Sequence, residues 1–211
     1  MDTTYRDRAE AGATLADRLG SLANRSDVIV LGLVRGGVPV AAAVAERLAA
    51  PLDVLVVRKL GVPMAPELAF GAVGPGGVRV LNEEIAERLE PDEVEEVVRA
   101  ETAELRRREE RYRGGRPPLR LDDRIAVVVD DGLATGATAR AAVGVARKLG
   151  ARRVVVAVPV GAPESYDLLA RTADEVVCPL RPAEFGAVSR YYEDFHEVSD
   201  DEVVAALTGS G

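Results

Sequence analysis

The sequence predicts an α/β fold in which a mostly parallel sheet is flanked by helices. Short valine-rich runs, typical of strands buried on both faces, alternate with segments whose apolar residues recur at helical spacing. The chain is 47% hydrophobic but only 4% aromatic, which favours a helix-covered parallel sheet over an aromatic-rich sandwich. At 211 residues it is expected to form one large domain, or one domain with a small appendage.

The N-terminal part is predicted to form a helix and then a strand-helix-strand unit. Residues 5–23 have their apolar side chains at helical spacing. A buried strand over residues 28–34 ends in a glycine turn, an alanine-rich helix follows at 40–48, and a second strand is expected at 53–57. Because such crossovers are right-handed, the two strands should lie parallel in one sheet.

Residues 58–81 have a different character, because glycine and proline interrupt two short apolar runs at 68–73 and 78–81. This pattern predicts a long mobile loop with a small hairpin. The glycine and proline content of residues 60–76 is expected to prevent regular structure there. Loops this long in compact domains are usually functional or disordered.

The rest of the chain continues the alternation of helices and strands. Asn82 is a candidate helix cap, and a long charged helix is predicted to begin at Pro91 and to cover residues 92–112. Its glutamate and arginine residues are more typical of a solvated face than of a binding site. The other predicted elements are strands at 125–129, 154–158 and 176–178 and helices at 138–149, 163–170 and 200–207.

The charge and cysteine content argue against several classes of protein. The 27 lysine and arginine residues and 35 acidic residues give a net charge of −8, which disfavours a general nucleic-acid or anionic-membrane surface. The single cysteine, Cys178, is expected in the core of a protein from a reducing compartment. The charged N-terminus is unlike a signal peptide and no apolar run approaches ~20 residues, so a cytoplasmic location is expected. The only histidine, His196, is assigned no role.

One stretch carries specific chemistry: residues 126–138, which read Ala-Val-Val-Val-Asp-Asp-Gly-Leu-Ala-Thr-Gly-Ala-Thr. They connect a predicted strand to a predicted helix. Such a turn presents free backbone N–H groups and the positive end of a helix dipole, which suits a phosphate monoester. The carboxylates of Asp130 and Asp131 can only accept hydrogen bonds, which suits the vicinal hydroxyls of a ribose. The stretch therefore predicts a site for a ribose 5-phosphate.

This stretch resembles the 5-phosphoribosyl 1-pyrophosphate (PRPP) signature of the type I phosphoribosyltransferases, and every position of that signature matches. No Walker A motif and no G-x-G-x-x-G at a helix start offers a competing interpretation. The resemblance implies a Rossmann-like phosphoribosyltransferase core over residues 1–178. A small C-terminal hood or cap would then occupy residues 179–211.

The resemblance also implies roles for the residues of the signature. The 5′-phosphate would be bound by Gly132, Ala134, Thr135, Gly136, Ala137 and Thr138. Asp130 and Asp131 would be the catalytic residues, and either could hold Mg²⁺, in part through water, because this ion keeps its hydration and seeks few carboxylates. Asp131 could also stabilise the positive charge that develops on the ribose.

A second group of residues is expected at the pyrophosphate. The run Arg35-Gly36-Gly37 resembles the family's pyrophosphate loop, in which an unusual peptide geometry exposes amides, and Arg35 would pair with phosphate oxygens. Taken alone, the run could equally be an ordinary turn with a solvated arginine. Arg58 and Lys59 follow the next strand, where the family often places a basic residue, and the sequence does not choose between them. Residues 60–76 are expected to close over bound pyrophosphate as a lid.

The acceptor site is expected in residues 179–196, where aromatic side chains concentrate. These are Phe185, Tyr191, Tyr192 and Phe195. Planar rings offer a nucleobase a stacking surface worth roughly 1–3 kcal/mol per base. The same rings could instead fill a small core under the C-terminal cap, and the sequence supports both interpretations equally.

The predicted function is transfer of the ribose 5-phosphate of PRPP to an acceptor, expected to be a nitrogenous base, with release of pyrophosphate and with Mg²⁺ as cofactor. The alternative is a PRPP-binding regulator with the same fold and no catalysis. A PRPP-forming pyrophosphokinase is disfavoured, because it needs an ATP site and two such domains in tandem. The sequence leaves the acceptor and the oligomeric state open, although the long helix offers a surface for a homodimer.

Overall fold

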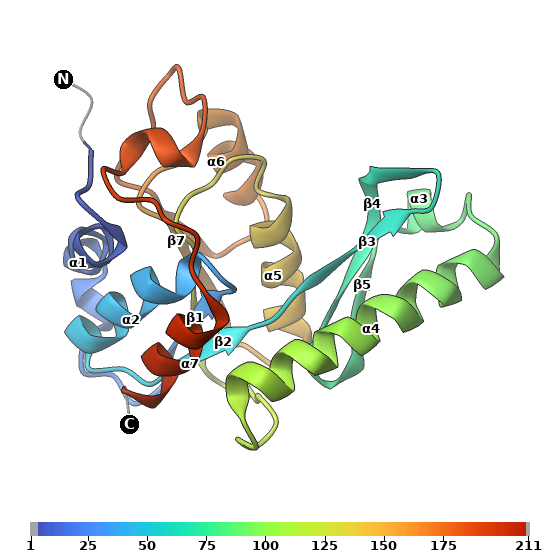
Figure 1. Ribbon diagram of the computed structural model, residues 1–211, viewed down its shortest axis with the longest axis horizontal. Coiled ribbons are helices and arrows are strands. Elements are labelled where there is room, and N and C mark those ends of the chain that lie inside the picture. The colour runs from blue at the N-terminus through green and yellow to red at the C-terminus, as the bar shows by residue number, and fades with distance from the viewer. Residues whose placement is uncertain (1–3, 210–211) are drawn as a thin grey trace.

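The computed structural model describes residues 4–209 and confirms the α/β class (Figure 1). Its main sheet has five parallel strands in the order β2-β1-β6-β7-β8. These are β1 (Val28–Leu33), β2 (Leu52–Leu55), β6 (Ile125–Val129), β7 (Arg153–Ala157) and β8 (Glu175–Val177). The helices are α1 (Arg8–Arg18), α2 (Gly37–Leu48), α3 (Glu83–Ala86), α4 (Pro91–Arg113), α5 (Ala137–Lys148), α6 (Pro163–Leu169) and α7 (Asp200–Thr208). Every strand predicted for the parallel sheet is present.

The side chains of the sheet pack alternately into two cores, one on each face. Along β1, Val28 and Val30 lie in the core with α1, α2 and α7, whereas Ile29 and Leu31 lie in the core with α5 and α6. Because both faces are covered, β1 and β6 are buried along their whole length, which explains their unbroken apolar sequences. Cys178 is buried in the second core, as expected.

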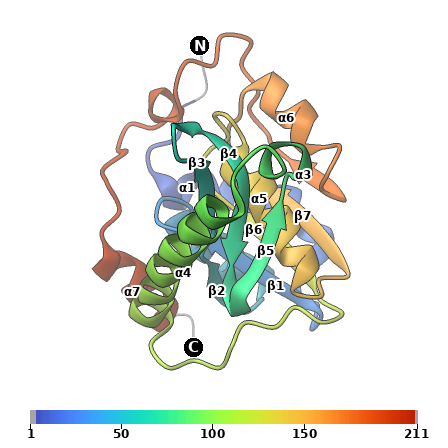
Figure 2. The same cartoon turned by 90° about the vertical axis from the view of Figure 1, so that its right-hand side faces the viewer.

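Residues 58–81 form a second sheet of three antiparallel strands, not a loop with a small hairpin. The strands are β3 (Arg58–Val62), β4 (Ala65–Gly74) and β5 (Val78–Leu81). The expectation of irregular structure is wrong because the glycines lie at turns and close contacts: a Cβ on Gly71 would be 2.4 Å from the carbonyl oxygen of Val80, and Gly76 has a φ of 69°. Figures 1 and 2 show this sheet beside α4, extending away from the main sheet.

The predicted long charged helix is α4, which has 23 residues. It begins at Pro91 behind a capping box and ends before Gly114, which adopts a left-handed φ of 46°. Val98 and Leu105 are buried, and the helix packs against β3, β4 and α7. Helix α4 therefore joins the second sheet to the C-terminal segment.

The segment after β8 crosses the carboxyl end of the main sheet before it forms α7. Val188 packs so closely against the turn after β6 that a Cβ on Gly132 would lie 2.5 Å from its methyl carbon. Near the start of the described chain, the amide of Tyr5 donates to the carbonyl of Tyr191 at 2.8 Å. The segment before α1 and the segment before α7 thus lie side by side near the strand ends. Within residues 4–209, no helix is long and apolar enough to cross a membrane.

Candidate functional site

The two glycine turns predicted from sequence are in direct contact at the carboxyl ends of the neighbouring strands β1 and β6. A Cβ on Gly36 would lie 2.1 Å from Oδ2 of Asp131, and a Cβ on Gly37 would lie 2.5 Å from the carbonyl oxygen of Val129. Only glycine allows this approach, because any side chain would displace the acidic turn. The peptide between Val34 and Arg35 is cis, an unusual peptide geometry of the kind that the resemblance implied for this loop.

The turn between β6 and α5 has the features of a phosphate-binding loop. Gly136 adopts a left-handed φ of 71° directly before the first turn of α5, whose amides have no acceptor within the helix. Residues Ala134, Thr135 and Thr138 are exposed. The loop is held from behind, because the amide of Leu133 donates to the carbonyl of Val160 at 2.9 Å. The exposed residues of the loop are therefore held in place by a hydrogen bond on its buried side.

The carboxyl groups of Asp130 and Asp131 are perturbed by their surroundings. Burial and the adjacent charge of Asp131 raise the pKa of Asp130 well above its ordinary value. Burial also raises the pKa of Asp131, although Arg8 opposes that change. Oδ1 of Asp130 accepts a hydrogen bond from the amide of Asp131 at 2.9 Å. Such a pair, costly to ionise in the free protein, is a feature of binding sites.

Arg8 is a member of the site that the sequence analysis did not identify. Its Nε and Nη2 donate to Oδ2 of Asp131 at 3.1 and 3.0 Å, and its Nη1 donates to the carbonyl of His196 at 2.9 Å. The guanidinium also lies 4.1 Å from the ring centroid of Phe195. Only 7% of the Arg8 side chain is exposed. An arginine in the first turn of a helix gives no signal in the sequence that it reaches an acid more than a hundred residues away.

The basic residues predicted at the pyrophosphate lie in different surroundings. Arg35 is at the site and pairs with Glu197, while its Nη1 lies 4.0 Å from Oδ1 of Asp200. Nε of Arg58 donates to Glu101 of α4 at 2.7 Å, so this arginine is engaged in holding α4. Lys59 lines a cavity with Arg140. Neither Arg58 nor Lys59 lines the cavity beside Asp131 that Arg35 lines.

The aromatic side chains predicted for the acceptor are packed in a core. Phe185, Tyr191 and Tyr192 are only 9%, 4% and 6% exposed. The ring of Tyr192 lies 5.7 Å from that of Tyr5, and its hydroxyl donates to the carbonyl of Asp131 at 2.6 Å. Phe185 and Tyr191 stack on each other with centroids 5.8 Å apart. These contacts favour the packing interpretation over the stacking one, because the three rings are buried.

A cavity of about 360 Å³ adjoins the meeting point of the two turns. It is lined by Arg8, Arg35, Gly36, Asp131, Phe195, His196, Glu197 and Val198. The predicted Asp131 and Arg35 thus share one cavity with Arg8, which only the structure reveals. This cavity, together with the loop of residues 134–138, is the candidate site.

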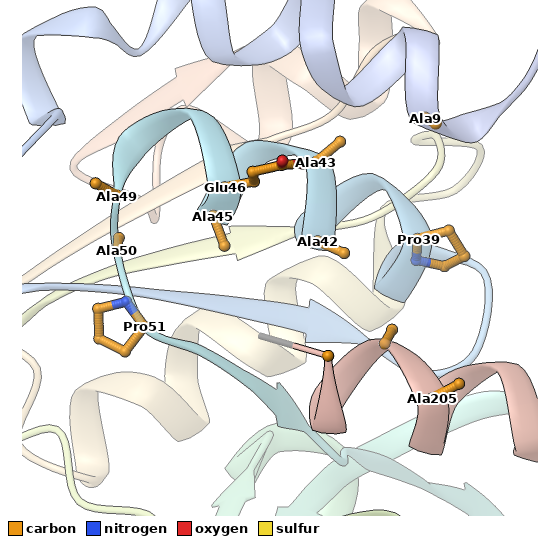
Figure 3. Close-up of a pocket in the computed structure, with 12 residues that line it drawn as sticks. Ala9, Pro39, Ala42, Ala43, Ala45, Glu46, Ala49, Ala50, Pro51 and Ala205 are labelled. Carbon is orange, nitrogen blue, oxygen red and sulfur yellow. The ribbon is translucent and has the colours of Figure 1, made fainter. Parts of the chain in front are cut away.

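A larger cavity lies elsewhere, between α2 and α7, with a volume of about 800 Å³ (Figure 3). Alanine and proline dominate its lining, and of the described residues there Glu46 alone carries a charge. A wall of this kind lacks the convergent polar groups that orient a ligand. Size is therefore a poor guide here, and the smaller cavity beside Asp131 is the better candidate.

The fold and the candidate site together indicate the protein family to which the chain belongs. The sequence profile of the phosphoribosyl transferase domain family matches residues 4–195, and the chain belongs to that family. Two strains of Mycobacterium tuberculosis each have a relative that bears a provisional name as a phosphoribosyl transferase and is 56% identical over 205 residues. These matches cover 96% of this chain but 46% of each relative, so the chain spans about half the length of either protein.

The structure is also similar to solved structures. TT1426 from Thermus thermophilus is 47% identical, and the match covers 98% of this chain and 99% of that one with a TM-score of 0.90. The AQ2163 protein from Aquifex aeolicus is 14% identical with a TM-score of 0.50, over 95% of this chain and 86% of that one. The second likeness supports the fold alone.

Proposed function

We propose that this protein transfers the ribose 5-phosphate group of PRPP to an acceptor, a nitrogenous base, and releases pyrophosphate. The observation that carries the proposal is the contact between the Gly36 turn and Asp131, where a Cβ would lie 2.1 Å from the carboxylate. This contact places a glycine turn with an arginine beside two acids and a phosphate-type loop. A ribose with phosphate groups at both ends requires that combination.

The loop of residues 132–138 would bind the 5′-phosphate. Its left-handed Gly136 opens the first turn of α5 to the ligand, and the exposed Thr135 and Thr138 add hydroxyl donors. Backbone amides bind a phosphate with little reorganisation, because the loop is already held by its hydrogen bond to Val160. On the other side of the acids, Arg35 would pair with pyrophosphate oxygens and favour its departure.

Asp130 and Asp131 would accept hydrogen bonds from the ribose hydroxyls. Arg8 fixes the orientation of the Asp131 carboxylate through two bonds to Oδ2. With its geometry set in advance, this carboxylate can stabilise positive charge that develops on the ribose as pyrophosphate leaves. The role of Arg8 is to position Asp131, since its own donors are directed at protein atoms.

The donor set is compatible with Mg²⁺ but not with a metal held by the protein alone. Among the described residues there is no group of three or more His, Cys, Asp or Glu side chains that could hold an ion. Two adjacent carboxylates suit Mg²⁺, which keeps several waters and takes phosphate oxygens from the substrate. When bound, the ion would neutralise charge on the leaving pyrophosphate. We therefore propose Asp130 and Asp131 as its protein contacts, in part through water.

Calorimetry with PRPP and Mg²⁺ tests the proposal. The Asp130→Asn/Asp131→Asn variant should lose most of its PRPP affinity, whereas Asp167→Asn, on the exposed part of α6, should bind as the wild type does. Release of pyrophosphate in the presence of a panel of purine and pyrimidine bases then identifies the acceptor. Unchanged PRPP affinity in the double variant would remove the assignment of the two acids.

A PRPP-binding regulator is the second candidate. The pairing of Arg8 with Asp131 favours it, because one of the two acids is engaged by the protein itself. The two functions differ in a single measurement. Binding of PRPP without pyrophosphate release, for every base in the panel, would favour the regulator.

A further inference from the structure

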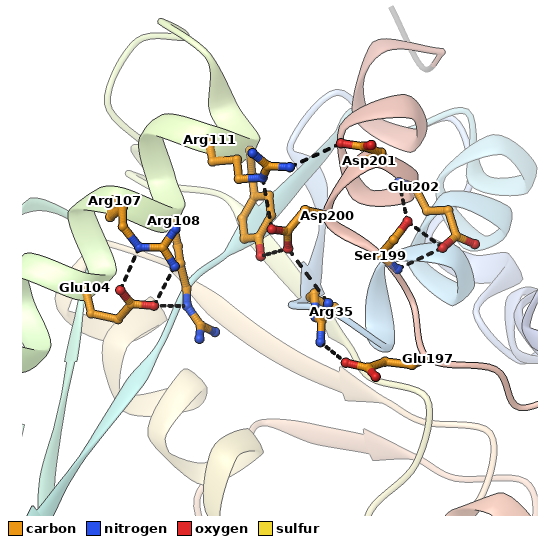
Figure 4. A network of polar contacts seen from close by, with 11 residues as sticks. Arg35, Glu104, Arg107, Arg108, Arg111, Glu197, Ser199, Asp200, Asp201 and Glu202 are labelled. Carbon is orange, nitrogen blue, oxygen red and sulfur yellow. Dashed lines mark hydrogen bonds and ion pairs between the residues drawn. The ribbon is translucent and has the colours of Figure 1, made fainter.

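A pocket outside the candidate site is lined by four arginines. Arg35, Arg107, Arg108 and Arg111 surround a cavity of about 320 Å³, which we call the arginine pocket (Figure 4). Val34, Tyr112 and Asp200 complete its lining. None of residues 130–138 lines it, so it is distinct from the phosphate loop and the acids. Arg35 lines both this pocket and the cavity beside Asp131, and thus connects the two.

Three of the four arginines lie together because of their spacing along α4. Residues 107, 108 and 111 are spaced so that positions 108 and 111, and 107 and 111, are neighbours on the helix surface. Like charges at such positions repel each other. The protein as a whole carries a net charge of −8, so a concentration of four guanidinium groups in one cavity is a local exception that an anionic ligand would explain.

Two of the carboxylates that pair with these arginines are weak competitors for a ligand, whereas Asp200 and Glu104, 33% and 30% exposed, pair with Arg111, Arg107 and Arg108 in less exposed surroundings. Asp201 and Glu197, which pair with Arg111 and Arg35, have side chains 92% and 81% exposed. Ion pairs at such exposure contribute little, because water and salt screen them. A phosphate carries more charge than a carboxylate and accepts paired bonds from the planar guanidinium, so it can displace them.

Arg108 also has N–H donors that are not paired with an acceptor in the described residues. Its Nε donates to Glu104 at 2.7 Å, and Glu104 is shared with Arg107. Within the described part of the chain, Nη1 and Nη2 of Arg108 have no acceptor, and Figure 4 shows both directed away from Glu104. These donors are available for an oxyanion without breaking any existing contact.

We propose that the arginine pocket binds a phosphate group that does not belong to PRPP. The inference rests on the proposed function for its setting, since the pocket adjoins the candidate PRPP site through Arg35. Two sources share this chemistry: a phosphate carried by the acceptor itself, and a free phosphate that acts as an effector. In either case Arg107, Arg108 and Arg111 bind the phosphate group. Arg35, which lines both cavities, couples this binding to the candidate PRPP site.

The test titrates inorganic phosphate into the protein saturated with PRPP and Mg²⁺, followed by calorimetry. The wild type should bind additional phosphate, and Arg107→Gln/Arg108→Gln should weaken that binding by about tenfold or more, the value of one or two charge-assisted hydrogen bonds. Arg106→Gln is the matched control, because Arg106 is on the same helix, is exposed and does not line the pocket. It should bind phosphate as the wild type does.

Several outcomes would overturn the inference. Equal phosphate affinity in the double variant and the wild type would do so, and so would competition between phosphate and PRPP for a single site. The double variant should still bind PRPP, so a lost phosphate site is distinguishable from a failed proposed function. If the wild type does not bind PRPP at all, the phosphate titration of the two variants still tests the pocket.

The kinetics distinguish the two sources. If the phosphate belongs to the acceptor, pyrophosphate release should require a phosphorylated acceptor, and the double variant should raise KM for that acceptor while KM for PRPP stays near the wild-type value. If the phosphate is an effector, free phosphate should change the rate with an unphosphorylated acceptor, and the double variant should abolish that response.

Discussion

Asp130 and Asp131 are held in surroundings that disfavour their ionised forms. Asp130 has no basic partner among its described hydrogen bonds, whereas Asp131 is paired with Arg8. A buried carboxylate beside a like charge reduces the stability of the free protein. Binding sites commonly keep such groups because the ligand, not the fold, compensates them.

The variant Asp130→Asn should therefore be more stable than the wild type. We expect its free energy of unfolding at pH 7 to rise, because the amide removes a buried charge whose pKa the fold raises. The pKa of Asp130 is raised in the folded state, so the penalty is absent below the ordinary value of 3.8 and grows as pH rises above it. The gain should shrink as pH falls. Denaturant unfolding at several pH values measures this, and a less stable variant at pH 7 would contradict it.

Tyr192 is a packing residue, and its replacement should affect stability. Its ring lies 5.7 Å from Tyr5 and 5.0 Å from Phe195, and its hydroxyl donates to the carbonyl of Asp131. Tyr192→Ala should lower the free energy of unfolding by roughly 3–5 kcal/mol. Tyr192→Phe, which keeps the ring, should lower it by only about 1 kcal/mol. Thermal unfolding measures both, and a normal Tm for the alanine variant with a raised KM for the base would restore the stacking interpretation.

The second sheet is the element most suited to move. At its far end Met64 is 92% exposed and Leu68 is 50% exposed, although both are apolar. Its inner end is anchored, because Arg58 pairs with Glu101 of α4. A sheet held at one end, with uncovered apolar side chains at the other, can close over a ligand and exclude water from the reacting carbon.

We expect hydrogen exchange to slow in residues 60–76 when PRPP and Mg²⁺ are added. The amides of β1 serve as an internal control, since this strand is fully buried and should exchange slowly in both states. An identical pattern over residues 60–76 with and without ligand would contradict a lid. The lid remains a prediction, although the segment has more regular structure than the sequence suggested.

The start of α7 is stabilised by an exposed network around the only histidine. Nε2 of His196 lies 2.9 Å from Glu202 and Nδ1 lies 3.0 Å from Asp194. Hydrogen bonding to Glu202, and then to Asp194, raises the pKa of His196 above its ordinary value of 6.5. The hydrogen bond from the backbone amide of Ser199, and then those from His196 and the Ser199 hydroxyl, lower the pKa of Glu202 to about 2.

The proton NMR titration of this single histidine should give a pKa above 6.5. The contribution of protonated His196 is fully present below pH 6.5 and is lost as pH rises through the folded-state pKa. Glu202→Gln should lower that pKa while it keeps the capping box. Glu193→Gln, an exposed control in the same segment, should leave it nearly unchanged. A histidine pKa insensitive to Glu202 would refute the assignment.

The two sheets of the molecule are joined through a buried ion pair. Nε and Nη2 of Arg113, at the end of α4, donate to the two carboxylate oxygens of Asp53 on β2, both at 3.0 Å. Arg113 is 9% exposed and Asp53 is 8% exposed. Helix α4 is thus bound to the edge strand of the main sheet. The same helix pairs with Arg58 of β3 and contributes arginines to the arginine pocket.

Removal of one partner of this pair should be strongly destabilising. Arg113→Met leaves Asp53 buried without its partner, and we expect a loss of roughly 3–5 kcal/mol in the free energy of unfolding. Arg99→Met, at an exposed position of the same helix, should change it by less than about 0.5 kcal/mol. Denaturant unfolding compares them. Equal stability of the two variants would show that the pair does not hold the layers together. Dimerisation through α4 stays a prediction, which analytical ultracentrifugation can test.

The strands, the helices and the phosphate-type turn could be read from the chain because their causes are local. Apolar periodicity predicts β1 and β6, and the adjacent acids and glycines of residues 130–136 are contiguous in sequence. The contact of the Gly36 and Asp131 turns has a simple cause, since parallel strands place their carboxyl ends at one edge of a sheet. The strand pairing of residues 58–81 could not be predicted from the sequence. Glycine and proline indicate the local conformational preference of the backbone, and the cross-strand contacts that override this preference are not visible in the sequence.

The partners of the site side chains depend on contacts between segments far apart in sequence. Arg8 reaches Asp131 across 123 positions, and Arg35 meets Glu197 across 162. No periodicity or spacing encodes such pairs, since they arise only when α1, the turns and the C-terminal segment pack together. The same packing buries Tyr192, so that residues which resemble a stacking surface in sequence become a core. Local patterns therefore predicted which residues carry the phosphate chemistry, and long-range packing established which of them are free to use it.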